Sequence, residues 1–296
     1  MLSTTGNQTG HRLLILSTVI LLTTCISISC AMSLRTAVVT GSNRGLGLEM
    51  IKQLSAGKSF DKIYAICRKS SEELNSIVDK SVSHVEIIDG VEVTKESTYS
   101  TVKRVLKTNE AEPIGIDLLI HNAGAYGPPR DFKSAKEMYG SQSLENIDME
   151  AMMFSFQLNT LAPLFLTKAL LPNLKSKNDA TKETTRKVII ISSLMGSITD
   201  NTGGSHYGYR TAKAGVNMVG KTLSVDLRDD KIAVGLVHPG YVYTGFGGED
   251  DEKREGQRDV DESVRGVLEA VDQVTLENTG CFLHGNYGEG VKPLEW

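Results

Sequence analysis

The sequence contains few cysteines and no excess of positive charge. It has four cysteines in 296 residues and a formal net charge of -4. A nucleic-acid-binding surface is strongly basic, so we expect no nucleic-acid partner. Cys25 and Cys30 lie near the amino end. Cys67 and Cys281 are too few for a disulfide framework and lie near no His or Cys at metal-ligand spacing, so we expect no metal site.

Acidic residues are missing from the start of the chain until Glu49. In this stretch His11 and Arg12 precede an apolar run from Leu13 to Ile28, and small residues follow near Ser29 to Ala31. This order is typical of a cleaved secretory signal or an organelle-targeting leader. The run is slightly shorter than a bilayer-spanning helix needs, so a retained membrane anchor is the second interpretation.

The chain has no internal repeat and no composition break after this leader. We therefore predict a leader over residues 1–32 and one domain over residues 33–296. The leader would direct the protein to an organelle or the secretory pathway, with membrane contact if it is retained. If Met32 is the working start, the domain would be cytoplasmic.

Short β-branched runs alternate with helical patterns from residue 34 onward. The strand runs are largely apolar, as a parallel sheet buried on both faces requires. The pattern predicts an α/β fold, a single-domain Rossmann-type doubly wound parallel sheet with helices on both faces. Strands are expected at 36–40, 62–68, 84–88, 116–124, 187–193, 232–240 and 280–285. A charged stretch, 247–264, is expected to be a solvated segment or a lid.

A glycine-rich turn with Gly41, Gly45 and Gly47 separates the first strand from the first helix. Glycines let backbone N–H groups approach a phosphate, and a helix N-terminus adds positive potential. No Gly-Lys-Ser/Thr follows, so the turn is not a P-loop. The alternative is a tight strand-to-helix turn without a ligand.

The end of the second strand lacks the acidic residue that would bind the ribose 2'-hydroxyl of NAD. Cys67, Arg68 and Lys69 stand there instead, and Arg44 lies in the glycine-rich turn. Guanidinium groups suit a 2'-phosphate, which favours NADP(H) over NAD(H). The alternative is a pair of solvated arginines.

Two tyrosine–lysine pairs have helical four-residue spacing, Tyr99–Lys103 and Tyr209–Lys213. Residues at this spacing share one face of a helix. A lysine ammonium beside a phenol could tune it for proton transfer, but the spacing alone does not select a pair.

Five motifs in order provide the context: TGSNRGLG (40–47), HNAG (121–124), IISS (190–193), YRTAK (209–213) and HPGYVYT (238–244). Together they resemble the short-chain dehydrogenase/reductase superfamily over nearly the whole chain after residue 33. The segments LMGSI and TDNTGGSH and the short C-terminus are similar to its C-factor (C-signal) and carbonyl reductase branch.

The resemblance selects the second pair. It implies that Tyr209 donates or accepts the proton, Lys213 is its partner, Ser193 orients the carbonyl and Asn159 supports a water relay. A tyrosine near pKa 10 is a poor base at neutral pH, so a nearby lysine ammonium and a cationic nicotinamide should favour the phenolate. Ser192 is expected to be structural, and Tyr99–Lys103 a solvent-facing coincidence.

The cofactor contacts implied by the resemblance include the glycine-rich turn, Arg68 and the ends of later strands. They are Gly41, Ser42, Asn43, Arg44, Gly45, Leu46, Gly47, Arg68, Val93, Asn122, Ala123, Gly124, Tyr209, Lys213, Pro239, Gly240, Val242 and Thr244. The sequence departs from the family pattern at two places. His121 replaces the first Asn of Asn-Asn-Ala-Gly and is expected to be a packed strand residue. Glu92-Val93 stands for an Asp-Val pair, which leaves the adenine contact open.

The resemblance implies an NADP(H)-dependent oxidoreductase that acts on a small carbonyl or secondary alcohol. The alternative is a C-factor-like signalling protein that binds the dinucleotide with incidental turnover. Homo-oligomers are possible, since family members occur as monomers, dimers and tetramers.

Overall fold

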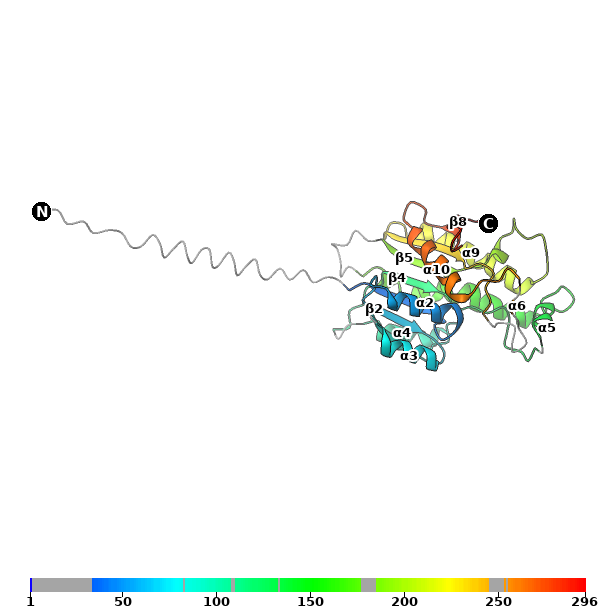
Figure 1. Ribbon diagram of the computed structural model, residues 1–296, viewed down its shortest axis with the longest axis horizontal. Helices are drawn as coiled ribbons and strands as arrows, with labels where there is room; N and C mark the ends of the chain where they lie inside the picture. Colours follow the sequence, from blue (N-terminus) through cyan, green and yellow to red (C-terminus); the bar gives the residue numbers. More distant parts are fainter. Residues whose placement is uncertain are drawn as a thin grey trace. The chain divides into compact units, whose positions relative to one another are not determined.

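The central element is one eight-stranded sheet with the order β3-β2-β1-β4-β5-β6-β7-β8 (Figure 1). All neighbouring strands pair in parallel except β7 and β8, which are antiparallel. The strands are β1 (Thr36–Thr40), β2 (Lys62–Ile66), β3 (His84–Ile88), β4 (Leu118–His121), β5 (Arg186–Ile191), β6 (Ile232–His238), β7 (Cys281–His284) and β8 (Lys292–Pro293).

This computed structural model describes Met1, Lys253 and residues 34–81, 83–107, 110–132, 134–176, 185–244 and 255–296. The predicted leader, apart from Met1, lies outside these ranges, as do residues 247–252 and 254 of the charged stretch that was expected to be a solvated segment or a lid. Leu34–Trp296 forms one compact unit. In the described ranges, no helix has the length and apolar character to cross a membrane.

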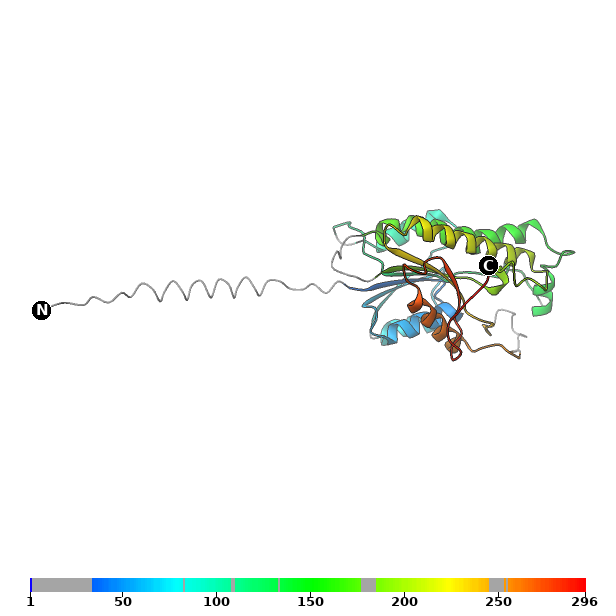
Figure 2. The ribbon, with the colours of Figure 1, turned by 90° about the horizontal axis from the view of Figure 1, so that it is seen from above.

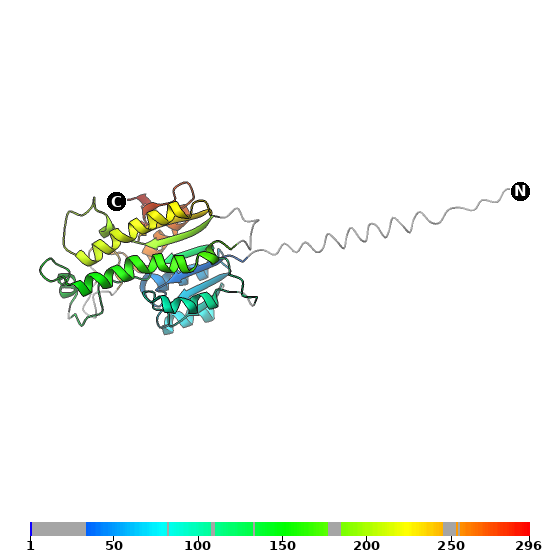
Figure 3. The ribbon, with the colours of Figure 1, turned by 180° about the vertical axis from the view of Figure 1, so that it is seen from behind.

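Helices cover both faces of the sheet (Figure 2). The helices are α2 (Gly45–Ala56), α3 (Glu72–Lys80), α4 (Tyr99–Val105), α5 (Ala135–Gly140), α6 (Met149–Phe156), α7 (Ala162–Ala169), α8 (Leu171–Leu174), α9 (Tyr207–Asp226) and α10 (Val260–Gln273). A π-helical turn, Gln157–Leu161, joins α6 to α7. The long α6–α7 run and α9 lie side by side (Figure 3).

Alternation along β1 explains why the sheet is covered twice. Ala37 and Val39 join one core with α2 and α10, whereas Val38 joins the other with α4 and α7. All three side chains are fully buried. A strand with two buried faces is apolar along most of its length, as Ala37, Val38 and Val39 are, so the apolar runs were correctly interpreted as parallel strands.

Several strands end earlier than predicted. The strand expected over 187–193 ends at Ile191, because Ser193 begins a 3-10 turn, where its Oγ accepts from the Met195 N–H at 3.2 Å. The strand expected over 232–240 ends at His238, since Pro239 has no N–H to donate. The residues after these ends are therefore free to form a site.

Candidate active site

The predicted site residues gather at the carboxyl edge of the sheet. The glycine-rich turn follows β1, Arg68 follows β2, Asn122–Gly124 follow β4, Ser193 follows β5, and Pro239–Thr244 follow β6. Strand order reverses direction between β1 and β4. In open α/β sheets, ligands bind at the carboxyl ends of the strands beside such a switch point.

The glycine-rich turn has the shape of a phosphate cradle. A Cβ at Gly47 would lie 2.1 Å from the Gly41 carbonyl oxygen, and a Cβ at Gly41 would lie 2.8 Å from the Ala123 Cα. Gly45 has a φ of 54° and open space around its Cβ position. The first turn of α2 contains no acidic residue. The turn is thus packed against the protein at Gly41 and Gly47 and open at Gly45, the side at which a phosphate is expected.

Asn122 fixes this turn from the next strand. Its Nδ2 donates to the carbonyl oxygens of Thr40 at 3.0 Å and Gly41 at 3.2 Å. Ser42 Oγ donates to the Ile66 carbonyl at 3.1 Å. Asn122 and Ser42 therefore hold the backbone shape of the turn, whereas Asn43, Arg44 and Leu46 lie along it at the start of α2.

The two predicted 2'-phosphate ligands lie on adjacent strand ends. Arg44 is the extended residue before α2, and Arg68 follows β2. The Arg68 side chain is 69% exposed, with Nη1 3.8 Å from Glu92 Oε2. An exposed ion pair at this distance is weak, so Arg68 can exchange it for a stronger phosphate contact.

Val93, the residue predicted to contact the adenine, lies in the segment after β3. Val93 is buried, and its carbonyl accepts from the Tyr99 hydroxyl at 2.7 Å. Asp89 directly follows β3, and its Oδ1 accepts from Cys67 Sγ at 3.4 Å. Asp89 is therefore the acidic residue nearest the strand end. The role predicted for Val93 stays a prediction. Tyr99 is buried rather than solvent-facing, which corrects that expectation, whereas Lys103 is exposed.

Ser193 and Tyr209 meet at the candidate reaction centre. Burial raises the pKa of Tyr209 to about 12, and a hydrogen bond with the Ser193 hydroxyl acts in the opposite direction. Burial has the larger effect on this pKa, and Lys213 is not among its causes. A phenol with this pKa is protonated at neutral pH, which suits a proton donor.

Lys213 lies one helical turn beyond Tyr209 and is buried. Its Nζ donates to the Ile191 carbonyl at 2.9 Å and lies 5.5 Å from the centre of the Tyr209 ring. Burial lowers the pKa of Lys213 to about 8. Gly196 permits this packing, because a Cβ there would lie 2.7 Å from the Lys213 backbone.

Asn159 sits in the π-helical turn, opposite Gly124. Its Nδ2 donates to the Ala125 carbonyl at 2.8 Å, and its Oδ1 accepts from the Ala125 N–H at 3.3 Å. Pro163 lacks the N–H that would bond the Asn159 carbonyl in an α-helix. A Cβ on Gly124 would lie 2.9 Å from Asn159 Oδ1 and 3.8 Å from Lys213 Nζ. The side chains of Asn159 and Lys213 thus both lie beside Gly124, and the water relay stays a prediction.

The two serines at the end of β5 have different surroundings. Ser192 Oγ donates to Asn217 Oδ1 at 2.5 Å, and both residues are buried. This contact ties β5 to α9, which agrees with the structural role expected for Ser192. His121 is also a packed residue, with Nε2 2.8 Å from Thr167 Oγ1. Burial lowers the pKa of His121 to about 3.

The segment after β6 is held by a residue that the sequence did not single out. Arg258 pairs with Val242, accepting from the Tyr243 N–H at 3.0 Å and donating its own N–H to the Tyr241 carbonyl at 2.8 Å. Pro239 accepts from Ser263 Oγ at 2.7 Å. Gly240 has a φ of 87°, and Thr244 is partly buried. The sequence placed Arg258 in a charged stretch expected to be solvated, so no sequence pattern indicated that it would hold the segment after β6.

An aromatic wall beside Tyr209 was also missed. Tyr126 lies 5.3 Å from Tyr209, 5.1 Å from Tyr139 and 5.6 Å from His206 between ring centres. The Tyr126 hydroxyl is hydrogen-bonded to His206 Nδ1. Tyr126 and Tyr139 come from a segment without a family motif, and only the fold brings them to His206 and Tyr209.

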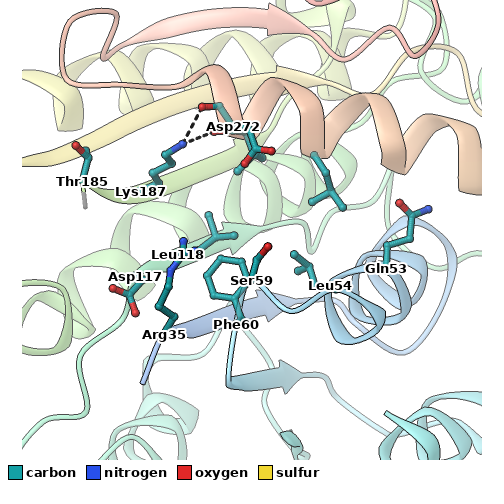
Figure 4. A pocket seen from close by; sticks show the side chains of 13 residues that line it. Arg35, Gln53, Leu54, Ser59, Phe60, Asp117, Leu118, Thr185, Lys187 and Asp272 are labelled. Atoms are coloured by element: carbon teal, nitrogen blue, oxygen red, sulfur yellow. Dashed lines mark hydrogen bonds between the residues drawn. The ribbon is translucent and has the colours of Figure 1, made fainter. Parts of the chain in front are cut away.

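A separate cleft of about 190 Å³ lies at the opposite, amino-terminal edge of the sheet (Figure 4). Arg35, Asp117, Lys187 and Asp272 are among its lining residues. Lys187 Nζ donates to the carbonyls of Val271 at 2.8 Å and Asp272 at 3.1 Å. None of the predicted site residues lines this cleft, so it is distinct from the Tyr209 centre.

The fold and the site define an oxidoreductase of the dinucleotide-binding α/β class. Residues 35–255 match the family model for short chain dehydrogenase. The chain belongs to this family.

Relatives agree with this assignment. C-signal of Myxococcus xanthus is 35% identical over 167 residues, which cover 56% of this chain and 87% of that protein. A 1-hydroxy-2-glutathionyl-2-methyl-3-butene dehydrogenase of Rhodococcus sp. is 26% identical over 85% of this chain and 96% of the relative.

Solved structures give the same fold. The NADPH-bound carbonyl reductase from chicken fatty liver has a TM-score of 0.72 at 29% identity, covering 89% of this chain and 99% of that one. Carbonyl reductase Sniffer of D. melanogaster has a TM-score of 0.73 at 26% identity, covering 89% and 100%. The predicted doubly wound fold and the predicted family are confirmed.

Proposed function

We propose that this protein is an NADP(H)-dependent carbonyl reductase that transfers a hydride between the nicotinamide and a carbonyl or secondary alcohol. The observation that carries the proposal is the meeting of Ser193, Tyr209 and Lys213 beside the glycine-rich turn. The similarity to an NADPH-bound carbonyl reductase supports it.

Each residue of the centre has a separate task in this proposal. Ser193 Oγ donates to the substrate oxygen and orients it. Tyr209 gives its proton to that oxygen during reduction and takes it back during oxidation. Lys213 and Asn159 supply the next proton through water. The hydride is supplied by the nicotinamide when it is bound.

A preference for NADP(H) is part of the proposal. Arg44 and Arg68 lie where the 2'-position of the adenosine ribose is expected, and no acidic residue follows β2 directly. A guanidinium binds a 2'-phosphate through charge-assisted hydrogen bonds. The partner is a small molecule, and the oligomeric state remains a prediction.

The identity with C-signal favours one second candidate, a signalling protein with incidental turnover. Fluorescence titration of residues 33–296 with NADPH and NADH, followed by NADPH consumption with a panel of carbonyl compounds, separates the two. Tight NADPH binding with turnover supports the reductase. Tight binding without turnover on any compound supports the second candidate.

A further inference from the structure

The amino end of α9 is capped by a residue from another segment. His206 precedes the helix, and its side chain makes no capping bond. The first N–H groups of a helix have no partner inside it. Gln142 supplies two: its Oε1 accepts from the Tyr209 N–H at 2.9 Å, and its carbonyl accepts from the Tyr207 N–H at 3.2 Å.

Burial, a hydrogen bond and two neighbouring glycines hold the Gln142 side chain in this position. Its side chain is buried, with a residue exposure of 1%. Its Nε2 donates to the carbonyl of Tyr126. A Cβ on Gly208 would lie 3.0 Å from Gln142 Oε1, and one on Gly127 would lie 3.2 Å from Nε2. Two glycines thus leave room for this one amide.

The same amide links α9 to the aromatic wall. The Tyr126 carbonyl accepts from Gln142, its ring centre lies 5.3 Å from that of Tyr209, and its hydroxyl is hydrogen-bonded to His206 Nδ1. His206 follows Ser205, and both have a positive φ, of 56° and 54°. Two successive non-glycine residues with left-handed backbone angles are strained, so contacts with surrounding residues must stabilise this backbone conformation.

We propose that Gln142 is a positioning residue for the reaction at Tyr209. Its Oε1 fixes the first turn of α9 and therefore the Tyr209 hydroxyl relative to Ser193. Its Nε2 fixes Tyr126 and the wall that faces the substrate. The side-chain amide of Gln142 thereby positions Tyr209 and the aromatic wall relative to each other. This inference rests on the proposed reductase function.

Two substitutions separate these tasks. Gln142→Met keeps the size of the side chain but removes its two side-chain hydrogen bonds, those to the Tyr209 N–H and the Tyr126 carbonyl. We therefore expect kcat to fall about tenfold while the NADPH dissociation constant stays within twofold. Gln142→Glu keeps an acceptor for the Tyr209 N–H but, when ionised, cannot donate to Tyr126. We expect its KM to rise at high pH and to return toward the original value as the carboxyl group is protonated.

Gln53→Met is the matched control. Gln53 Nε2 also donates to a backbone carbonyl, that of Asp261 at 3.0 Å, but on the α2–α10 face. Its kcat should stay within twofold of the unaltered protein. An equal kcat for Gln142→Met and Gln53→Met would overturn the proposal. If Gln142→Met does not fold, a pH-independent KM for Gln142→Glu would overturn it.

Failure of the reductase function would appear separately, as absent turnover in the unaltered protein. Amide hydrogen exchange at Tyr209 then still tests the cap. Faster exchange in Gln142→Met than in Gln53→Met supports it, and equal exchange overturns it.

Discussion

Each of the two edges of the sheet contains a lysine that is shielded from solvent, buried Lys213 at the carboxyl edge and half-buried Lys187 at the amino edge. At the carboxyl edge, Lys213 Nζ donates to the Ile191 carbonyl at 2.9 Å. At the amino edge, Lys187 Nζ donates to the Val271 carbonyl at 2.8 Å. Burial lowers the pKa of both. A tyrosine ring lies 5.5 Å from Lys213, whereas the described lining of the Lys187 cleft includes no tyrosine.

The comparison shows that a perturbed lysine alone does not distinguish the proposed reaction centre from the cleft at the other edge. The amino edge has a cleft of about 190 Å³ and two cations, Arg35 and Lys187. Its described lining residues include no tyrosine–lysine pair on a helix and no serine at the carboxyl end of a strand. The two edges differ in the side chains that lie together. Ser193, Tyr209 and Lys213 lie together at the carboxyl edge, where ligand sites form in parallel sheets.

The largest expected difference between the edges is in turnover. Lys213→Met should lower kcat/KM for NADPH-dependent carbonyl reduction about 100-fold, because it removes the charge and donor beside Tyr209. Lys187→Met should change kcat/KM less than twofold. Steady-state kinetics of both variants checks this. Similar losses would break the comparison.

The pH dependence of stability tests the burial of Lys213. The folded pKa of Lys213 is about 8, below its ordinary value of 10.5. Between these values the unfolded chain binds a proton that the folded chain has released, so the free energy of unfolding rises with pH, by about 3 kcal/mol in total. Urea unfolding from pH 7.5 to 10.5 should show that Lys213→Met removes most of this rise. Lys213→Met and unaltered curves with the same slope would contradict it.

The relative affinities for NADPH and NADH test the proposed 2'-phosphate contact at the carboxyl edge. Arg68→Ala should weaken NADPH more than NADH, by roughly 1.5 to 3 kcal/mol, because only NADPH carries the 2'-phosphate. Arg35→Ala at the amino edge is the control and should change neither affinity. Fluorescence titration measures both. Equal losses of NADPH and NADH affinity in Arg68→Ala would refute the 2'-phosphate role.

The smallest effect is expected at His121, which lies at the carboxyl edge but takes no part in the proposed chemistry. His121→Asn should leave kcat within twofold and lower the free energy of unfolding by about 1 kcal/mol, since the buried contact with Thr167 is lost. Kinetics and chemical unfolding check this. A tenfold fall in kcat would assign His121 a role in the reaction.

Much of the fold could be predicted because parallel strands need apolar residues on both faces. Val38 and its neighbours in β1 carry that pattern. Ordered motifs also indicated the turn after β1 and the pair Tyr209–Lys213. Strand ends were less predictable, since Ser193 looks like a strand residue until its hydroxyl caps the next turn.

The rest of the site depends on contacts across distant segments. Gln142 lies 67 residues from Tyr209 in sequence, and Arg258 lies in a charged stretch that predicts solvent exposure. No local pattern marks either residue. The pKa of Tyr209 was also unpredictable from spacing, because burial rather than Lys213 dominates it.

The measurement that tests the central claim most directly is the comparison of Tyr209→Phe with the unaltered protein in NADPH binding and carbonyl reduction. The phenylalanine ring keeps the packing but removes the hydroxyl. We predict that turnover falls at least 100-fold while the NADPH dissociation constant stays within twofold. Retained turnover in Tyr209→Phe would contradict the assignment of Tyr209 as proton donor.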